Sequence, residues 1–345
     1  MARKRQPSMR DVAARAGVSQ TTVSLVLNNP ATSGIPESTQ ARIRAAIEEV
    51  GYRTNRLARA MRLDRTDTIG FISDDIATTP YANRMIRGAQ DAAWEAGRLL
   101  LIVSTGAFDH PDHQTIEQTA IDQLLERQVD GIVLAAMFHR VLDLPDGLRE
   151  KPSVLLNASS EAPDIASVVP DEYSAAYEAT SYLTDRGHRR IAHLTTRYPG
   201  AAWTLRLQGF RDAVEAVGAT VDEDLVLFDE STTEGGRRAT RLLLEHPDPP
   251  TAIFCHNDQY AMGAYQVAND LGVRIPEDLS VVGFDDQQLI AAEIVPGLTT
   301  MRLPHYEMGQ WVIQKLLDPE AGPLNATLPC PLIERASVAP PAGRG

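Results

Sequence analysis

From residue 68 onward, short apolar runs alternate regularly with longer amphipathic segments, and this alternation constrains the fold most strongly. Short apolar runs predict buried strands, and apolar residues spaced three and four apart predict helices. Strands that alternate with helices form parallel sheets with helices on both faces. The predicted strands span 68–73, 99–105, 131–135, 153–157, 190–194, 225–228, 252–255 and 280–284, and predicted helices include 81–96, 113–128, 172–186, 205–217, 235–246 and 259–271. So many strands fit two lobes better than one sheet.

The length of 345 residues allows two or three domains of ordinary size. No stretch reaches the roughly 18 to 20 uninterrupted apolar residues of a membrane helix. Residues 1–10 are basic but lead into no apolar segment of a secretory signal. Cys255 and Cys330 cannot build a disulfide framework, and no spacing of cysteine and histidine matches a zinc site. We therefore expect a cytoplasmic protein.

The charges are divided unevenly along the chain. The formal net charge is −13. Residues 1–65 contain 12 of the 33 basic residues and 5 of the 46 acidic ones, so this part carries +7 and the remainder −20. Such asymmetry predicts a basic module that binds a polyanion, joined to an acidic body.

The basic head is predicted to form three short helices within residues 8–50. Ser8 can cap the first helix, and Gly17 permits a left-handed stop. Ser19 can cap the second helix, and Pro36 opens the third. Two short helices joined by a tight glycine-containing turn are the helix-turn-helix pattern, whose second helix enters the major groove. The alternative is a three-helix cap with a solvated basic face, which the concentration of positive charge disfavours.

Polar side chains on the outer face of the second helix suit contact with bases. Gln20 can read adenine through a bidentate amide contact, and Thr21 and Ser24 can reach bases or phosphates. The arginines of the head can neutralise phosphate charge.

Two segments of the head resemble the lactose/galactose repressor (LacI/GalR) family. The first is DVAARAGVSQTTVS at residues 11–24, and the second is GYRTNRLARAM at residues 51–61, which resembles the segment that ends in the family's hinge helix. The resemblance implies that DNA is contacted by Ser19, Gln20, Thr21, Thr22, Ser24, Leu25, Asn28, Tyr52, Asn55, Arg56, Ala58 and Met61.

Two of these positions depart from the family pattern. Leu25 stands where an arginine is usual, and Met61 stands where the family has a leucine that wedges into the minor groove. Methionine is itself an apolar wedge that can unstack a base step. Residues 54–63 of the hinge form a short, arginine-rich stretch, below the roughly 12 to 15 residues that hold a helix alone in water. We expect it to fold against DNA and its dimer mate, so that a distant site can control its order.

The resemblance covers nearly the whole chain and implies its organisation. The fold class expected is an α/β core of two doubly wound parallel-sheet lobes, similar to periplasmic sugar-binding proteins, with an N-terminal all-α helix-turn-helix domain. Only seven residues follow Val338, which favours a dimer over a tetramer held by a C-terminal tail. The expected domains are 1–53 (head), 54–65 (hinge) and 66–345 (core), with a first lobe of about 66–161 and 295–322 and a second of about 162–294 and 323–338.

Polar residues follow several predicted strands of the core. In open α/β sheets, ligands bind outside the carboxyl ends of the strands. Asp74, Asn157, Asn257 and Asp285 stand at such ends, and their oxygens can accept hydrogen bonds from a neutral polyhydroxylated ligand. Capping of the following helix is the alternative role for an Asp or Asn there.

The family resemblance adds to this set. It implies that Arg206, in the motif LRLQGF, and Asp285, in VVGFDD, contact the effector. Tyr81, Trp203 or Phe138 could stack on a sugar face. The expected effector-binding residues are Asp74, Tyr81, Asn157, Trp203, Arg206, Asn257 and Asp285.

No nucleophile elbow, P-loop or dinucleotide fingerprint is present, so we expect no enzyme and neither cofactor nor metal. The sequence predicts a homodimeric transcription regulator, expected to be a repressor. It would bind near-palindromic double-stranded operator DNA under the control of a small molecule, expected to be a carbohydrate. A purine-type corepressor, a protein partner, or a role as a solute-binding protein are the alternatives.

Overall fold

The computed structural model describes residues 7–28, 34–52, 65–75, 83–198 and 200–342. The chain divides into two compact units, Met1–Thr66 and Asp67–Gly345. Some residues predicted to contact DNA or effector lie outside the described ranges, namely Asn55, Arg56, Ala58, Met61 and Tyr81.

The N-terminal unit consists of α1 (Met9–Ala16), α2 (Gln20–Asn28) and α3 (Glu37–Val50). The backbone N–H of Ser8 donates to Asp11 at 2.8 Å, which completes the capping box that the sequence predicts. Gly17 ends α1 in the left-handed conformation, at φ 65°. All three helices contribute to one small core. Its buried residues are Val12, Ala13, Ala16, Val23, Val26, Ile43 and Ala46.

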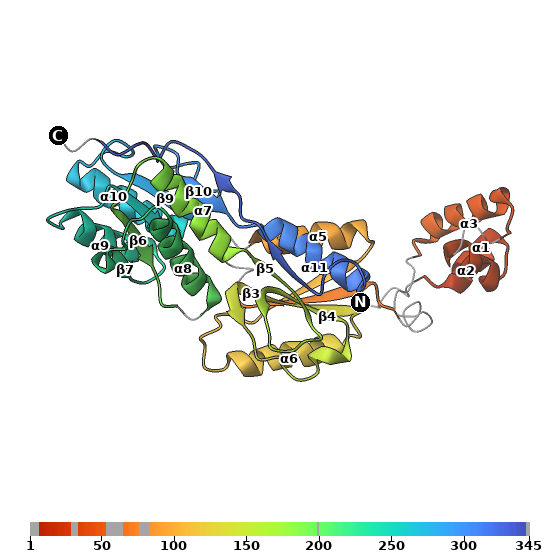
Figure 1. Ribbon diagram of the computed structural model, residues 1–345. Coiled ribbons are helices and arrows are strands. Elements are labelled where there is room, and N and C mark those ends of the chain that lie inside the picture. The colour runs from red at the N-terminus through yellow and green to blue at the C-terminus, as the bar shows by residue number, and fades with distance from the viewer. Residues whose placement is uncertain (1–6, 29–33, 53–64, 76–82, 199, 343–345) are drawn as a thin grey trace, which may run out of the picture. The chain divides into compact units, whose positions relative to one another are not determined.

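The second unit begins with a six-stranded sheet in the order β11-β5-β4-β3-β1-β2. Its pairings are parallel. The strands are β1 (Thr68–Ser73), β2 (Leu99–Ser104), β3 (Gly131–Val141), β4 (Ser153–Ser159), β5 (Ala166–Pro170) and β11 (Asn325–Leu328). Helices α5 (Asn83–Glu95) and α11 (His305–Leu317) cover one face and α6 (His113–Glu126) the other, as Figure 1 shows.

A second six-stranded sheet has the order β12-β10-β9-β8-β6-β7, with β12 antiparallel to β10. Its strands are β6 (Ile191–Thr195), β7 (Val226–Phe228), β8 (Ala252–Cys255), β9 (Ser280–Asp285), β10 (Thr299–Arg302) and β12 (Leu332–Ile333). One face packs against α7 (Glu172–Asp185) and α8 (Ala201–Ala216), the other against α9 (Thr233–Leu244) and α10 (Asp258–Leu271). The predicted fold class, two doubly wound lobes, is confirmed.

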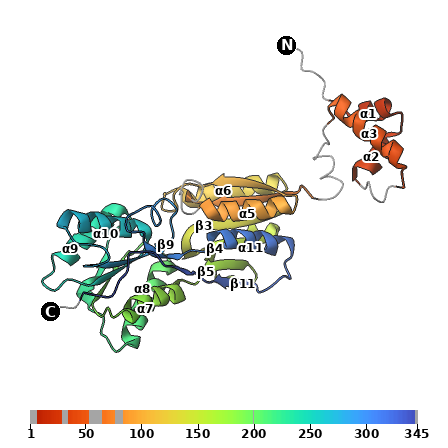
Figure 2. The same ribbon diagram turned by 90° about the horizontal axis from the view of Figure 1, so that it is seen from above.

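The lobe boundaries differ from the expected ones. β5 and β11 pair within the first sheet, although residues 162–294 and 323–338 were expected in the second lobe. β10 pairs with β9 in the second sheet, although residues 295–322 were expected in the first. The cause is the same in each case. β5, β10 and β11 each precede a point where the chain passes to the other lobe, and each pairs with the sheet of the lobe that the chain is about to leave. Figure 2 shows α11 and β11, in blue, beside the strands of the first lobe.

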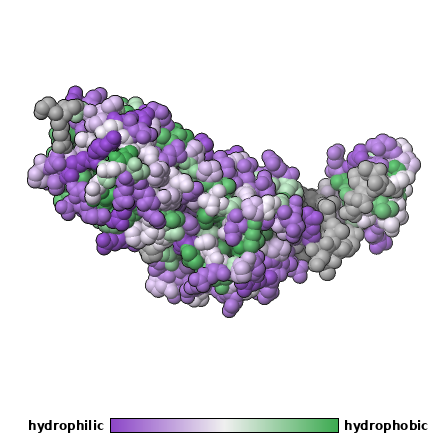
Figure 3. Space-filling view, in the orientation of Figure 1, coloured by the Kyte–Doolittle hydropathy of each residue, from purple (hydrophilic) through white to green (hydrophobic). Residues whose placement is uncertain are grey.

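On the face drawn in Figure 3, hydrophilic residues cover most of the second unit, with apolar residues scattered between them. This agrees with the acidic composition of residues 66–345. Among the helices that the structure describes, none combines the length and the apolar character needed to cross a bilayer.

Candidate functional site

The outer face of α2 presents the side chains that the sequence predicts for base contact. Gln20 and Thr21 are exposed, Ser24 is half-exposed, and Leu25 is 45% exposed. The intervening Val23 and Val26 are buried against α1 and α3. The helix therefore separates a core face from a face free to enter a groove.

Other residues predicted to contact DNA also take part in the structure of the head. The Ser19 hydroxyl accepts a hydrogen bond from the backbone N–H of Thr22 at 3.0 Å, so it caps α2 as expected. The hydroxyls of Ser19 and Thr22 also share a hydrogen bond at 2.8 Å. Tyr52 packs on the core of the head and is only half-exposed. Asn28 is the last residue of α2.

In the second unit, a cavity of about 440 Å³ lies between the two sheets. β3 and β4 supply one wall through Phe138, His139 and Asn157. The other wall follows the carboxyl ends of the strands of the second sheet, for example at His256 after β8 and Asp285 at the end of β9. The cavity is thus located where the strand-end argument places a ligand.

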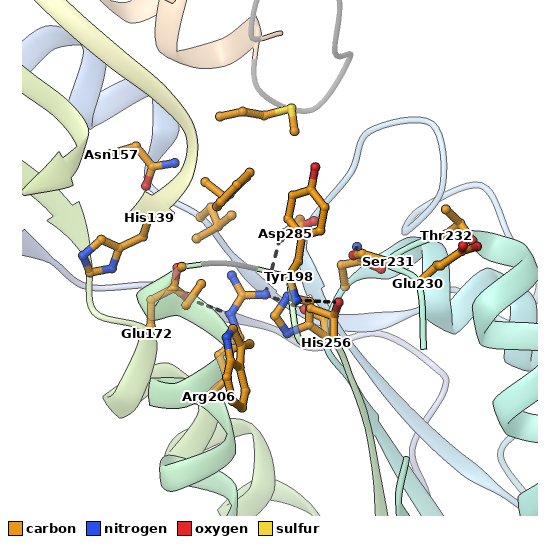
Figure 4. A pocket seen from close by; sticks show the side chains of 18 of the residues that line it. His139, Asn157, Glu172, Tyr198, Arg206, Glu230, Ser231, Thr232, His256 and Asp285 are labelled. Atoms are coloured by element: carbon orange, nitrogen blue, oxygen red, sulfur yellow. Dashed lines mark hydrogen bonds and ion pairs between the residues drawn. The ribbon is translucent and has the colours of Figure 1, made fainter. Parts of the chain in front are cut away.

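An ion-paired arginine forms the floor of this cavity (Figure 4). Arg206, on α8, is 4% exposed. Its Nε donates to Glu172 Oε2 at 2.7 Å, and its Nη1 donates to the carbonyl oxygen of His256. Nη1 also lies 4.0 Å from Asp285 Oδ1. The guanidinium stacks over the ring of Phe284, 3.6 Å from its centroid.

A glycine allows Glu172 and Arg206 to meet, because it lets α7 and α8 pack closely. A Cβ at Gly209 would overlap the carbonyl oxygen of Tyr173 and the backbone nitrogen of Tyr177. Gly209 stands one helical turn after Arg206 on α8, and Tyr173 follows Glu172 on α7. The glycine of the LRLQGF motif is therefore required for the contact that its arginine makes.

Burial changes the ionisation of several lining groups. Loss of hydration raises the pKa of Asp285 to about 7, against the opposing effects of Arg206 and of the hydrogen bond from Gln287. Burial lowers the pKa of His139, opposed by the negative charge of Glu172 and assisted by the positive charge of Arg206. The pKa of His256 falls well below its usual value because of burial and the positive charge of Arg206. Both shifts favour the uncharged imidazole.

Three residues that line the cavity each hold a buried polar atom without a hydrogen-bond partner in the protein. These atoms are Asn157 Oδ1, His139 Nδ1 and His256 Nδ1. The other end of Asn157 is fixed, because its Nδ2 donates to the Ala136 carbonyl at 3.1 Å. Buried polar groups without partners are costly. Among the lining residues, these three therefore have an unused capacity to hydrogen-bond a polar ligand or bound water.

Asn257 and Trp203 also line the cavity, as predicted. Asn257 Oδ1 accepts from the backbone N–H of Tyr260 at 2.9 Å, so it caps α10, and its Nδ2 donates to Ser231 at 2.7 Å. Trp203 belongs to the first turn of α8, which begins at Ala201, earlier than the predicted residue 205. Phe138 and Tyr198 line the cavity with it and meet edge to face, with centroids 5.1 Å apart.

Asp74 was expected in the site, but it is not among the residues that line the cavity. It is 3% exposed, and its Oδ2 accepts from Arg140 at 2.8 Å. The cause is strand order: β1 lies beside β3 on the side away from β4. Arg140 itself stacks over Phe138, 5.1 Å from the ring centroid, so Asp74 supports the cavity wall from behind.

Other lining residues were not found by sequence reasoning. His256 directly follows the predicted strand 252–255, so the strand-end rule could have found it. Ser231 lies three residues after the end of β7, in the loop before α9. His139 lies on an extension of β3 that ran past its predicted end at residue 135, and Glu172 follows β5, which was not predicted. No group of three or more metal-ligating side chains occurs in the described part of the chain.

Comparisons with known proteins agree with this architecture. Residues 66–336 match the family model "periplasmic binding proteins and sugar binding domain of LacI family", and residues 8–55 match "bacterial regulatory proteins, lacI family". The chain is 34% identical over 341 residues to the HTH-type transcriptional repressor CytR of Escherichia coli K12, covering 96% of each protein. Two solved structures of similar fold are the lac repressor dimer bound to operator and an anti-inducer (24% identity, TM-score 0.81, 97% of this chain and 100% of that one) and a CelR–cellobiose complex (29%, 0.67, 96% and 99%). The chain therefore belongs to the LacI family of bacterial regulatory proteins and is a DNA-binding transcriptional regulator.

Proposed function

We propose that this regulator is a homodimeric repressor whose affinity for a near-palindromic operator is controlled by a small polyhydroxylated molecule, a sugar or sugar derivative, bound between the two lobes. The observation that carries the effector site is the cavity of about 440 Å³ at the strand ends, where the lining residues Asn157, His139 and His256 each hold a buried polar atom without a partner. The similar CelR structure contains cellobiose. The proposed role is one of binding and needs no catalytic step.

The DNA-binding part of the proposal rests on the head. α2 presents Gln20, Thr21 and Ser24 to solvent from a rigid three-helix core. The residues of the predicted hinge, 54–65, lie almost wholly outside the described ranges. The similar lac repressor structure is a dimer on operator DNA.

Apolar side chains at one edge of the first lobe support dimerisation. Trp94, near the end of α5, is 75% exposed, and Leu99 and Ile102 on β2 are 50% and 38% exposed. β2 is an edge strand of its sheet. Neighbouring apolar side chains of this size on a surface are typical of protein interfaces.

A nucleobase or nucleoside is the second candidate effector. The aromatic wall of Phe138, Tyr198 and Trp203 favours it, because a planar base can stack on such rings. A sugar can use the same wall through its apolar face.

The test uses the full chain in two assays. Duplexes are selected from a random pool with the wild type, and ligands are then sought by the rise in melting temperature that specific binding produces. Asp285→Asn should abolish the effect of an identified ligand on operator binding while leaving operator affinity within about twofold. The control is Asp286→Asn, since Asp286 pairs with Arg335 at 2.6 Å and is not a lining residue of the cavity. An Asp285→Asn protein that responds like the wild type would contradict the assignment.

A further inference from the structure

Acidic side chains outnumber basic ones among the described residues that line the cavity. Among the described lining residues, Arg206 is the one arginine or lysine. Three acidic residues line the same cavity, namely Glu172, Asp285 and Glu230. The side chains of Glu172 and Asp285 are only 2% and 6% exposed, so solvent screens their charges weakly.

The positive charge of Arg206 is already matched within the protein. Its Nε–H donates to Glu172, and its Nη1 donates to the His256 carbonyl and lies 4.0 Å from Asp285 Oδ1. One face of the guanidinium covers the ring of Phe284. A site for phosphate or carboxylate usually offers an arginine fork with both N–H groups free to bind the anion bidentately. Here the Glu172 carboxylate occupies one side of that fork.

Three histidines line the cavity, namely His139, His256 and His305. Burial lowers the pKa of His139 and of His256, which favours the uncharged form of these two imidazoles. Each has an Nδ1 without a partner in the protein, and a neutral imidazole nitrogen can accept or donate according to its tautomer. Together with Asn157, these residues place uncharged side chains with an unused hydrogen-bonding atom in the lining of the cavity from both lobes.

We propose that the cavity selects an uncharged ligand over its phosphorylated or carboxylated counterpart, and that Glu172 is the residue that sets this selectivity. The inference rests on the proposed function, because it concerns the ligand of the same cavity. A phosphate group beside Arg206 would also stand beside two buried carboxylates. Repulsion from Glu172 and Asp285 would then oppose the attraction to the arginine.

The first experiment compares matched pairs of probes on the full-length wild type at pH 7.5. The pairs are glucose and glucose 6-phosphate, ribose and ribose 5-phosphate, adenosine and AMP, and uridine and UMP. We expect at least one uncharged member to raise the melting temperature, and its phosphate ester to bind at least tenfold more weakly. An ester that binds as tightly as its parent overturns the inference and leaves the proposed function standing. If no member of any pair binds, the proposed effector class fails and the inference fails with it.

The second experiment tests Glu172 directly. Glu172→Gln keeps an oxygen that can accept from Arg206 Nε but removes the negative charge. We expect the variant to bind the ester at least tenfold more tightly than the wild type does, with the affinity for the parent changed by less than threefold. The matched control is Glu178→Gln, the same change at an exposed position of α7. If Glu172→Gln does not fold, Glu172→Ser removes the same charge and is measured instead.

The ratio of the two affinities separates a selectivity role from a structural one. Loss of packing at Glu172 would weaken the parent and its ester together and leave their ratio unchanged. If Glu172→Gln has the same ratio of parent affinity to ester affinity as the wild type, Glu172 does not set the selectivity.

Discussion

At the residue scale, the buried arginine shows why the usual alanine test is poorly suited here. Removing Arg206 would leave Glu172 and Asp285 facing each other in a buried cavity without their common partner. Breaking a buried ion pair in this way costs about 3 to 5 kcal/mol. A lost effector response in such a variant would therefore report instability as much as lost contact. Isosteric changes of the surrounding acids are the sharper probes.

The first prediction at this scale concerns Gln20. Because its side chain is exposed on the outer face of α2, Gln20→Ala should weaken binding mainly at one operator position, by about 1–3 kcal/mol. Binding to a set of single-base operator variants measures this. Gln123→Ala, the same substitution at an exposed position of α6 in the other unit, is the control and should have no effect. A loss that is equal for all sequences would show that Gln20 does not read a base.

The second prediction concerns Glu117, on α6. Burial raises its pKa to about 7, opposed by Arg140 and assisted by Asp74. A carboxyl whose pKa is higher in the folded state stabilises the fold at low pH, and this contribution is lost as the pH rises towards 7. From pH 5 to pH 8, the wild type should therefore lose more unfolding free energy than Glu117→Gln, by up to about 3 kcal/mol.

Urea unfolding at a series of pH values measures this difference. Asp285 has a pKa raised in the same direction, so the Glu117 variant should keep part of the pH dependence. Glu126→Gln, an exposed change on the same helix, should behave like the wild type. Parallel curves for wild type and Glu117→Gln would contradict the raised pKa.

At the element scale, the close contact of α7 and α8 at Gly209 links stability to ligand binding. Gly209→Ala forces a methyl group against the α7 backbone at Tyr173, so the helices must separate. We expect a loss of about 1–3 kcal/mol in unfolding free energy, together with weaker ligand binding, because Arg206 moves away from Glu172. Urea unfolding and ligand titration measure the two effects. Glu215→Ala, an exposed change on α8, should change stability by less than about 0.5 kcal/mol.

The elements also show what the sequence could predict. Local periodicity and caps located α1, α2 and α3 and most strands of both sheets, because these signals lie within a few neighbouring residues. β5 spans only five residues between longer elements, and the pattern did not separate it from a loop. Missing β5 also hid Glu172, which follows that strand. The same strand-end rule that placed Asp285 would have found it.

Local sequence patterns could not predict contacts between residues that are far apart in the chain. Glu172 and Arg206 are 34 residues apart, and Asp74 and Arg140 are 66 apart. Asp74 ends a strand as the rule requires, but the order of the strands turns it towards Arg140 instead of the cavity. Strand order, which the sequence did not reveal, therefore decided which strand-end residues share the site.

At the scale of the whole molecule, positive charge prevails in the head and negative charge in the remainder, and the two serve different functions. The head carries a formal charge of +7 and the remainder −20. The acidic core repels phosphate, which should discourage nonspecific contact between the core and DNA. Within the core, part of the acidic excess is placed in the cavity, where Glu172 and Asp285 neutralise an arginine. The net charge of the chain alone therefore conceals both functions.

The last prediction concerns the coupling of these two functions. If the effector changes operator affinity, thermodynamic linkage requires that operator DNA change effector affinity in return. Because the proposed dimer holds two effector sites for each operator, the factor on operator affinity at saturating effector should equal the product of the factors by which operator changes effector affinity at the two sites, each within a range of about 5 to 150. Titrations of operator with and without saturating effector, and of effector with and without operator, measure these factors. Asp285→Asn should bring all of them to one. A mismatch between the operator factor and the product would reveal a further linked equilibrium, such as a change in oligomeric state between the two titrations, whereas factors of one in the wild type would show that the cavity does not control DNA binding.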